Sequence, residues 1–116
     1  MTQTPKDNLD ALLLVVTTMP NEGSAKALAK ALVEARLAAC VQMQPGMTPI
    51  YRWEGKVCEE SEVLLSAKTM QAKWLEICAF IQKAHPYDVP EILAFSPEQY
   101  DQQYGKWVQS EVNSKS

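Results

Sequence analysis

The sequence is poor in the residues that bind metals or cross-link chains: among 116 residues it has one histidine and three cysteines. A single histidine excludes a multi-histidine metal site within one chain. Cys40, Cys58 and Cys78 are an odd number without a close pair, which is not the spacing of a disulfide framework or a zinc ribbon. We therefore expect three free thiols in a reducing compartment.

Long apolar runs and clustered basic charges are also missing. No stretch approaches the ~20 apolar residues of a membrane span, and the polar residues 1–10 lack the apolar core of a signal peptide. The 11 Lys and Arg against 14 Asp and Glu give a formal net charge of −3, which leaves no polybasic surface for nucleic acid or anionic lipid. We expect a cytoplasmic chain with no nucleic-acid and no membrane partner.

Signatures of catalysis are absent as well. The sequence has no glycine-rich phosphate loop, no G-x-S-x-G and no H-E-x-x-H. No pair of carboxylates is spaced for obvious acid–base work. The sequence therefore predicts that the chain is not an enzyme.

The length and composition fit one domain. With 47% hydrophobic residues, the chain can bury one core and not two. We expect residues 1–10 to be a disordered tail and residues 11–112 to form the domain. Hydrophobic periodicity then predicts four strands, at residues 11–18, 38–53 with a break at Pro45-Gly46, 56–68 and 91–95.

Three helices are expected among these strands. The first covers residues 23–37 after the capping residue Asn21, the second follows a capping Thr69 and ends before Pro86, and the third begins at the capping box Ser96–Gln99. The order is β-α-β-β-α-β followed by a C-terminal helix. Two split βαβ units of this kind predict an α+β fold, a ferredoxin-like sandwich with helices over one face of an antiparallel sheet.

The hairpin made by the second and third strands is too long for the body of such a domain. Its 13-residue third strand would reach about 43 Å at ~3.3 Å per residue, whereas a compact chain of this length is about 35 Å across. A projecting hairpin exposes Ile50, Tyr51 and Trp53, and another copy of the chain is the simplest cover for them. A hairpin that bends back onto its own helices is the alternative.

Few side chains suggest chemistry by themselves. His85 stands at a helix end before Pro86, where it is either a ligand or a hydrogen-bonding residue. Acidic residues along the hairpin, Glu59 and Glu62 among them, either gather cations or form a solvated face. Lys68 either binds an anion or marks a solvated strand end.

Several segments, in this order, carry a resemblance to one family. They are Thr18-Met19-Pro20, Leu37–Val41 with Pro45-Gly46, Tyr51–Lys56, Glu62 with Lys68-Thr69, and His85–Ile92. The chain resembles the CutA, or divalent-cation-tolerance, proteins from about residue 13 to residue 107. The segment His-Pro-Tyr-Asp-Val-Pro-Glu-Ile at residues 85–92 is the most specific of the matches.

The resemblance implies a ferredoxin-like fold, a trimer like that of the PII signalling proteins, and tolerance of divalent metals, copper above all. Some family members carry a cysteine before the Thr-x-Pro segment and two histidines before the later proline. This chain has Thr17 and Ala84 at those positions and keeps His85, while Asp88 replaces a glutamate.

Two hypotheses follow from the resemblance. In the first, a homotrimer binds copper or another divalent cation weakly or between subunits, with His85 as the metal ligand. In the second, a PII-like trimeric module binds a small ligand or signalling partner in inter-subunit clefts without catalysis. The residues of those clefts would be Trp53, Lys68, Tyr87, Asp88 and Glu91. A ferredoxin-fold hydrolase such as an acylphosphatase ranks last, because residues 17–24 hold no arginine for a phosphate-binding loop.

Overall fold

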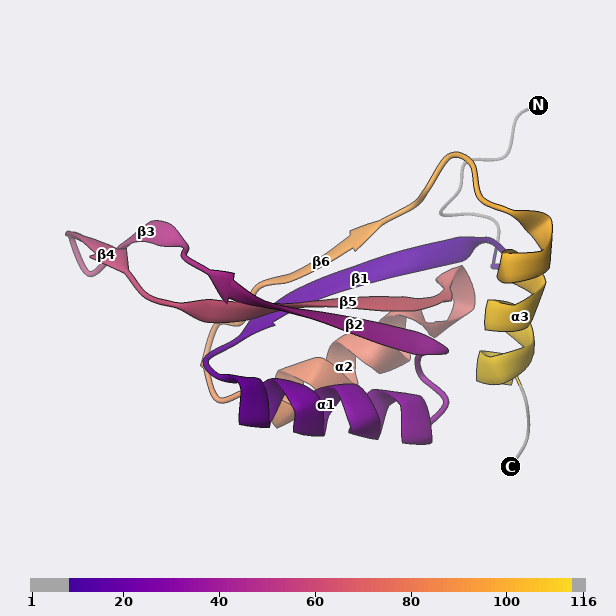
Figure 1. Cartoon of the computed structure of the whole chain (residues 1–116), viewed down its shortest axis with the longest axis horizontal. Coiled ribbons are helices and arrows are strands. Elements are labelled where there is room, and N and C mark those ends of the chain that lie inside the picture. Colours follow the sequence, from indigo (N-terminus) through magenta and orange to yellow (C-terminus); the bar gives the residue numbers. More distant parts are fainter. Residues whose placement is uncertain (1–8, 114–116) are drawn as a thin grey trace.

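The computed structural model describes residues 9–113, and the elements follow one another in the predicted order (Figure 1). The strands are β1 (Leu12–Met19), β2 (Cys40–Met47), β3 (Ile50–Trp53), β4 (Lys56–Glu59), β5 (Glu62–Met70) and β6 (Ile92–Phe95). The helices are α1 (Glu22–Glu34), the short 3-10 turn η2 (Gln71–Lys73), α2 (Trp74–Ala84) and α3 (Gln102–Asn113).

Four strands form one sheet in the order β2-β5-β1-β6, and every neighbouring pair is antiparallel. Helices α1 and α2 lie together on one face of this sheet, and α3 stands at one end (Figure 1). This strand order and this helical layer are those of a ferredoxin-like sandwich, so the predicted fold class is confirmed. None of the helices within residues 9–113 has the length and apolar character needed to cross a bilayer.

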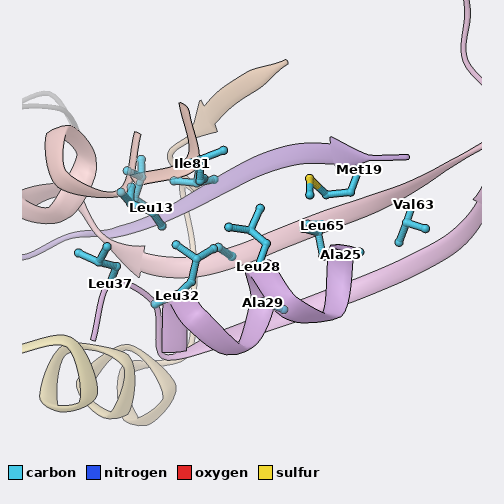
Figure 2. Close-up of a cluster of buried hydrophobic side chains, with 14 residues drawn as sticks. Leu13, Met19, Ala25, Leu28, Ala29, Leu32, Leu37, Val63, Leu65 and Ile81 are labelled. Carbon is cyan, nitrogen blue, oxygen red and sulfur yellow. The ribbon is translucent and has the colours of Figure 1, made fainter. Parts of the chain in front are cut away.

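The main core lies between the sheet and the two helices (Figure 2). Alternate residues of the central strands point into it, such as Leu13 and Val15 of β1 and Leu65 of β5, each at most 3% exposed. Leu32 of α1 and Ile81 of α2 meet them from the helical layer. Burial of side chains of this size contributes about 1.5–3 kcal/mol each to the stability of the fold. This gain favours the arrangement in which the helices cover this face of the sheet.

The opposite face of the sheet is covered only at one end. There α3 packs Val108 and Val112 against Leu12 and Met70. Beside the polar Gln42, Ser66 and Lys68, the apolar residues that alternate with the core positions along the rest of this face are only half-buried or exposed. We call them the open sheet face: Leu14, Val16, Leu64, Leu93 and Phe95.

The hairpin departs from the single long strand that the sequence predicts over residues 56–68. It contains two strands, β4 and β5, separated at Glu60-Ser61, and β3 and β4 form a separate two-stranded sheet. This two-stranded arm projects from the body instead of bending back (Figure 1). Its apolar side chains are largely solvent-exposed, with Ile50 at 69% and Val57 at 67%.

Two expected helix starts are wrong, because one capping side chain is buried in a strand and the other bonds to a residue distant in sequence. Thr69 is fully buried in β5 and caps nothing. Ser96 Oγ accepts a hydrogen bond from Gln71 Nε2 (2.7 Å), and α3 begins instead after Asp101, whose Oδ2 accepts from the Tyr104 amide (2.9 Å). The first helix is shorter than expected, since Arg36 adopts a φ of 60° after its end.

The N-terminal boundary of the domain also differs slightly from the expected one. Residues 1–8 of the predicted tail lie outside the described residues. Leu9 and Asp10 are held, because the Leu9 carbonyl accepts from the Ala72 amide (3.2 Å) and Asp10 Oδ1 accepts from Gln109 Nε2 (3.2 Å). The three cysteines are free, as expected, and each is half-buried.

Gly105 of α3 is the position where a side chain should cost most. A Cβ there would lie 2.6 Å from Cε2 of Tyr100, whose ring is held by a hydrogen bond from the Leu12 amide to its hydroxyl (3.3 Å). Although alanine favours a helix over glycine by about 1 kcal/mol, we expect Gly105→Ala to lower the free energy of unfolding by about 1–3 kcal/mol. Urea unfolding of the two proteins measures this change in the free energy of unfolding. Gly23→Ala in α1, where a Cβ meets only ordinary contacts, is the matched control, and equal stabilisation by both changes would contradict the packing described.

Candidate functional site

His85 ends α2 and joins it to the end of β1. The ring is 8% exposed. Its Nε2 lies 2.6 Å from the carbonyl oxygen of Thr18, and its Nδ1 lies 3.1 Å from the backbone nitrogen of Tyr87. The side chain therefore connects two segments that are 67 residues apart in sequence.

These two partners fix the tautomer of the ring. A carbonyl oxygen can only accept a hydrogen bond and a backbone amide can only donate one, so Nε2 carries the proton and Nδ1 accepts from Tyr87. The imidazole is neutral, and neither nitrogen keeps a free lone pair. Since a metal binds the lone pair of a neutral imidazole, a metal at His85 must first displace the Tyr87 amide. The ligand role of His85 stays a prediction, and this geometry counts against it.

Tyr87 is held at both its backbone and its side chain. Its amide bonds to His85, and its hydroxyl donates to Glu62 Oε2 on β5 (2.9 Å). The rings of His85 and Tyr87 lie 4.9 Å apart and are tilted by 51°. Burial first, and then the hydrogen bond to Glu62 and its negative charge, raise the pKa of Tyr87 to about 12. The two hydrogen bonds of Tyr87 hold the loop after α2 against the base of the hairpin.

A cavity of about 300 Å³ lies where the arm leaves the body. It is lined by Tyr51 and Trp53 of β3 and by Tyr87, Asp88 and Val89 of the loop before β6. We call it the aromatic cleft. Residues two apart on a strand share a face, so both β3 aromatic residues point into it. Desolvation, followed by the charges of Glu60, Cys58 and Glu62, raises the pKa of Tyr51.

Of the five residues predicted for a ligand cleft, Trp53, Tyr87 and Asp88 come together here. Lys68 does not. It lies along β5, where its Nζ donates to Gln42 Oε1, and it lines a separate cavity of about 270 Å³ beside the open sheet face. Glu91 is exposed and is not among the residues that line the aromatic cleft.

The prediction missed Tyr51 and Val89 as lining residues and Glu62 as the partner of Tyr87. The first could have been found from its spacing, because Tyr51 and Trp53 stand at alternate positions of one strand. The link between Tyr87 and Glu62 spans 25 residues and has no local signal.

A complete metal site is not assembled within residues 9–113. No three histidine, cysteine, aspartate or glutamate side chains in that range gather as metal ligands would. The acidic residues of the arm do not converge, because Glu54 lies in its turn and Glu59 at the opposite end of β4.

Together, the sheet order, the helices on one face and the projecting arm with a cleft at its root define a ferredoxin-like sandwich. The family model for the CutA1 divalent ion tolerance protein matches residues 13–111. The chain belongs to this family.

Several known proteins are similar to it. Protein CutA from Mus musculus is 44% identical over 99 residues, which cover 85% of this chain and 56% of that protein. The divalent-cation tolerance protein CutA from Thermus thermophilus is 44% identical over 95 residues, which cover 82% of this chain and 92% of that protein. The solved structure of a divalent cation tolerance protein from Thermus thermophilus superposes with a TM-score of 0.83 at 42% identity, over 86% of this chain and 97% of that one. The chain thus spans about half the length of the mouse relative.

His85→Ala tests the role of the ring directly. It leaves the Thr18 carbonyl and the Tyr87 amide without partners, so we expect the free energy of unfolding to fall by about 2 kcal/mol, with copper(II) affinity of the folded protein unchanged. Urea unfolding and calorimetric copper titration measure the two effects. Lys83→Ala, on the exposed side of the same helix, is the control. A large loss of copper affinity with little loss of stability would instead make His85 a ligand.

Tyr87 should ionise at unusually high pH. Because folding raises its pKa from 10.0 to about 12, the stability it contributes is fully present below pH 10 and is lost as the pH rises through about 12. A phenolate absorbance titration of the protein minus that of Tyr87→Phe should show a midpoint near 12, and Glu62→Gln should move that midpoint toward 10. An ordinary midpoint in the unchanged protein would contradict the Glu62 contact.

Proposed function

We propose that this protein acts in divalent-cation tolerance as a homotrimer, without catalysis. The observation that carries the proposal is the open sheet face. An antiparallel sheet can leave one face in water, but that face is then polar. Here Leu14, Val16, Leu93 and Phe95 make the half of the face formed by β1 and β6 apolar, and Leu93 and Phe95 remain 49% and 52% exposed. A second layer supplied by other copies is the simplest cover for this face.

The position of the arm indicates which surfaces of two copies would meet. It projects from one end of the molecule (Figure 1), whereas the free edges of the main sheet are β2 and β6. Contact between the arm of one copy and an edge of the next joins two different surfaces. Such contacts close into a ring when the rotation permits, and three copies is the number that the family resemblance implies.

The metal would be held between copies. Within residues 9–113 one chain brings no three ligands together, and in this proposal two chains share the site, with carboxylates of the arm, such as Glu59, as donors. The name of the family supports a role with divalent cations. Copper as the physiological metal, like the cytoplasmic location, stays a prediction.

The aromatic cleft favours a second candidate function, a PII-like binding module. The cleft has the size of a small-ligand pocket and is formed by side chains from two elements that meet at the root of the arm. A ligand there would contact both the arm and the loop after α2. Binding would then change the contact between the arm and the molecule that covers it.

Native mass spectrometry tests the assembly. We expect three copies of the 13.0 kDa chain, and Phe95→Lys should dissociate them because it places a charge in the buried apolar layer. The control is Val33→Lys, a similarly exposed apolar position (43%) on α1, which lies on the other side of the sheet (Figure 1). A monomeric unchanged protein, or a Phe95→Lys trimer, would contradict the proposal.

A further inference from the structure

We propose that the aromatic cleft binds a small organic cation through a methylated ammonium group. This assignment rests on the proposed binding module and names its class of ligand. The aromatic cleft is lined by residues of one chain.

The walls of the aromatic cleft are the first reason. Tyr51, Trp53 and Tyr87 line one cavity of about 300 Å³. The face of an aromatic ring carries negative potential, and a cation within about 6 Å of it gains about 0.5–2 kcal/mol. Three rings around one cavity are the arrangement in which quaternary ammonium groups are bound. The volume admits such a group with a short chain attached.

The second reason is that Tyr87, which forms one wall of the aromatic cleft, is already held in place. Tyr87 bonds to buried His85 through its amide and to Glu62 through its hydroxyl, so its ring loses little entropy on receiving a ligand. Donation from the hydroxyl to a carboxylate also polarises the phenol and increases the electron density of the ring. Both effects strengthen attraction for a cation.

The charges at the aromatic cleft select the sign of the ligand. Asp88 lines the cavity, Glu62 holds Tyr87, and Glu60 acts on both tyrosines. On the basic side, Lys56 lies opposite Trp53 in the arm, while the other strand neighbour, Arg52, points to the opposite face. Three carboxylates against one ammonium disfavour an anion.

The nature of the walls selects an organic cation over a metal ion. A hard divalent cation needs several oxygen ligands around it, and no such group converges within residues 9–113. A methylated ammonium spreads its charge over its methyl groups and loses its water at lower cost than a primary ammonium. It can therefore exchange hydration for contact with the rings and keep a carboxylate nearby.

Calorimetric titration of the assembled protein tests the assignment with choline and with 3,3-dimethylbutanol, which has the same shape without the charge. We expect choline to bind at least tenfold more tightly than the alcohol. Trp53→Ala and Asp88→Asn should each weaken choline binding by at least fivefold, and Asp88→Glu should restore most of it. Arg52→Ala, on the same strand but the other face, is the control and should bind choline normally.

The contrary outcomes separate the ligand class from the module itself. Equal affinity for choline and the neutral alcohol, both lost in Trp53→Ala, would overturn the cation assignment and leave a binding module. Choline binding that survives both Trp53→Ala and Asp88→Asn would place the ligand elsewhere and overturn the assignment to this cleft. No binding of choline, the alcohol, nucleotides or inorganic anions would overturn both.

Discussion

The arrangement at the root of the arm depends on the two hydrogen bonds of His85. Its neutral ring donates to the carbonyl of Thr18 and accepts from the amide of Tyr87, which ties the end of β1 to the loop after α2. That tie orients Tyr87 so that its hydroxyl reaches Glu62. Without it, the loop that lines the aromatic cleft would lose its attachment to the sheet. In this chain, then, the histidine serves first as a structural connector.

The second constraint is the asymmetry of the sheet. One face is filled by α1 and α2 (Figure 2), whereas α3 covers only an end of the other. The apolar residues of the open sheet face and the exposed Ile50 and Val57 of the arm are costly in water when the molecule is a monomer. Both are removed from water at once if copies pack around a common axis. The aromatic cleft, where arm and body meet, then stands next to the surfaces that assembly would order.

Much of the fold could be predicted because it is encoded locally. Alternation in the strands and 3.6-residue periodicity in the helices gave the element order, and the order defined the sandwich. The wrong helix starts at Thr69 and Ser96 arose where tertiary packing or a distant partner, Gln71, took a capping side chain. The division of the third strand at Glu60-Ser61 is a change of pairing partner, from β3 to β2, which apolar patterning does not show.

The candidate site was less predictable for a related reason. Trp53, Tyr87 and Asp88 came from the family resemblance, and they do meet. The sequence did not show that Lys68 lies away from the aromatic cleft. A residue pattern shows which face of a strand a side chain takes but not which end of the sheet it approaches. The bond between His85 and Thr18 joins residues 67 positions apart, and only the folded chain brings them together.

The most direct test of this view is a nitrogen-15 NMR measurement of the imidazole ring, which needs no assignment because the sequence has one histidine. We predict the neutral form with the proton on Nε2, with signals that remain sharp when one equivalent of copper(II) is added. A proton on Nδ1 would show that the Nε2 lone pair is free to bind a metal. Loss of the ring signals at substoichiometric copper would show that copper binds at the ring. That result would contradict the structural role of His85 and return it to the position of a ligand.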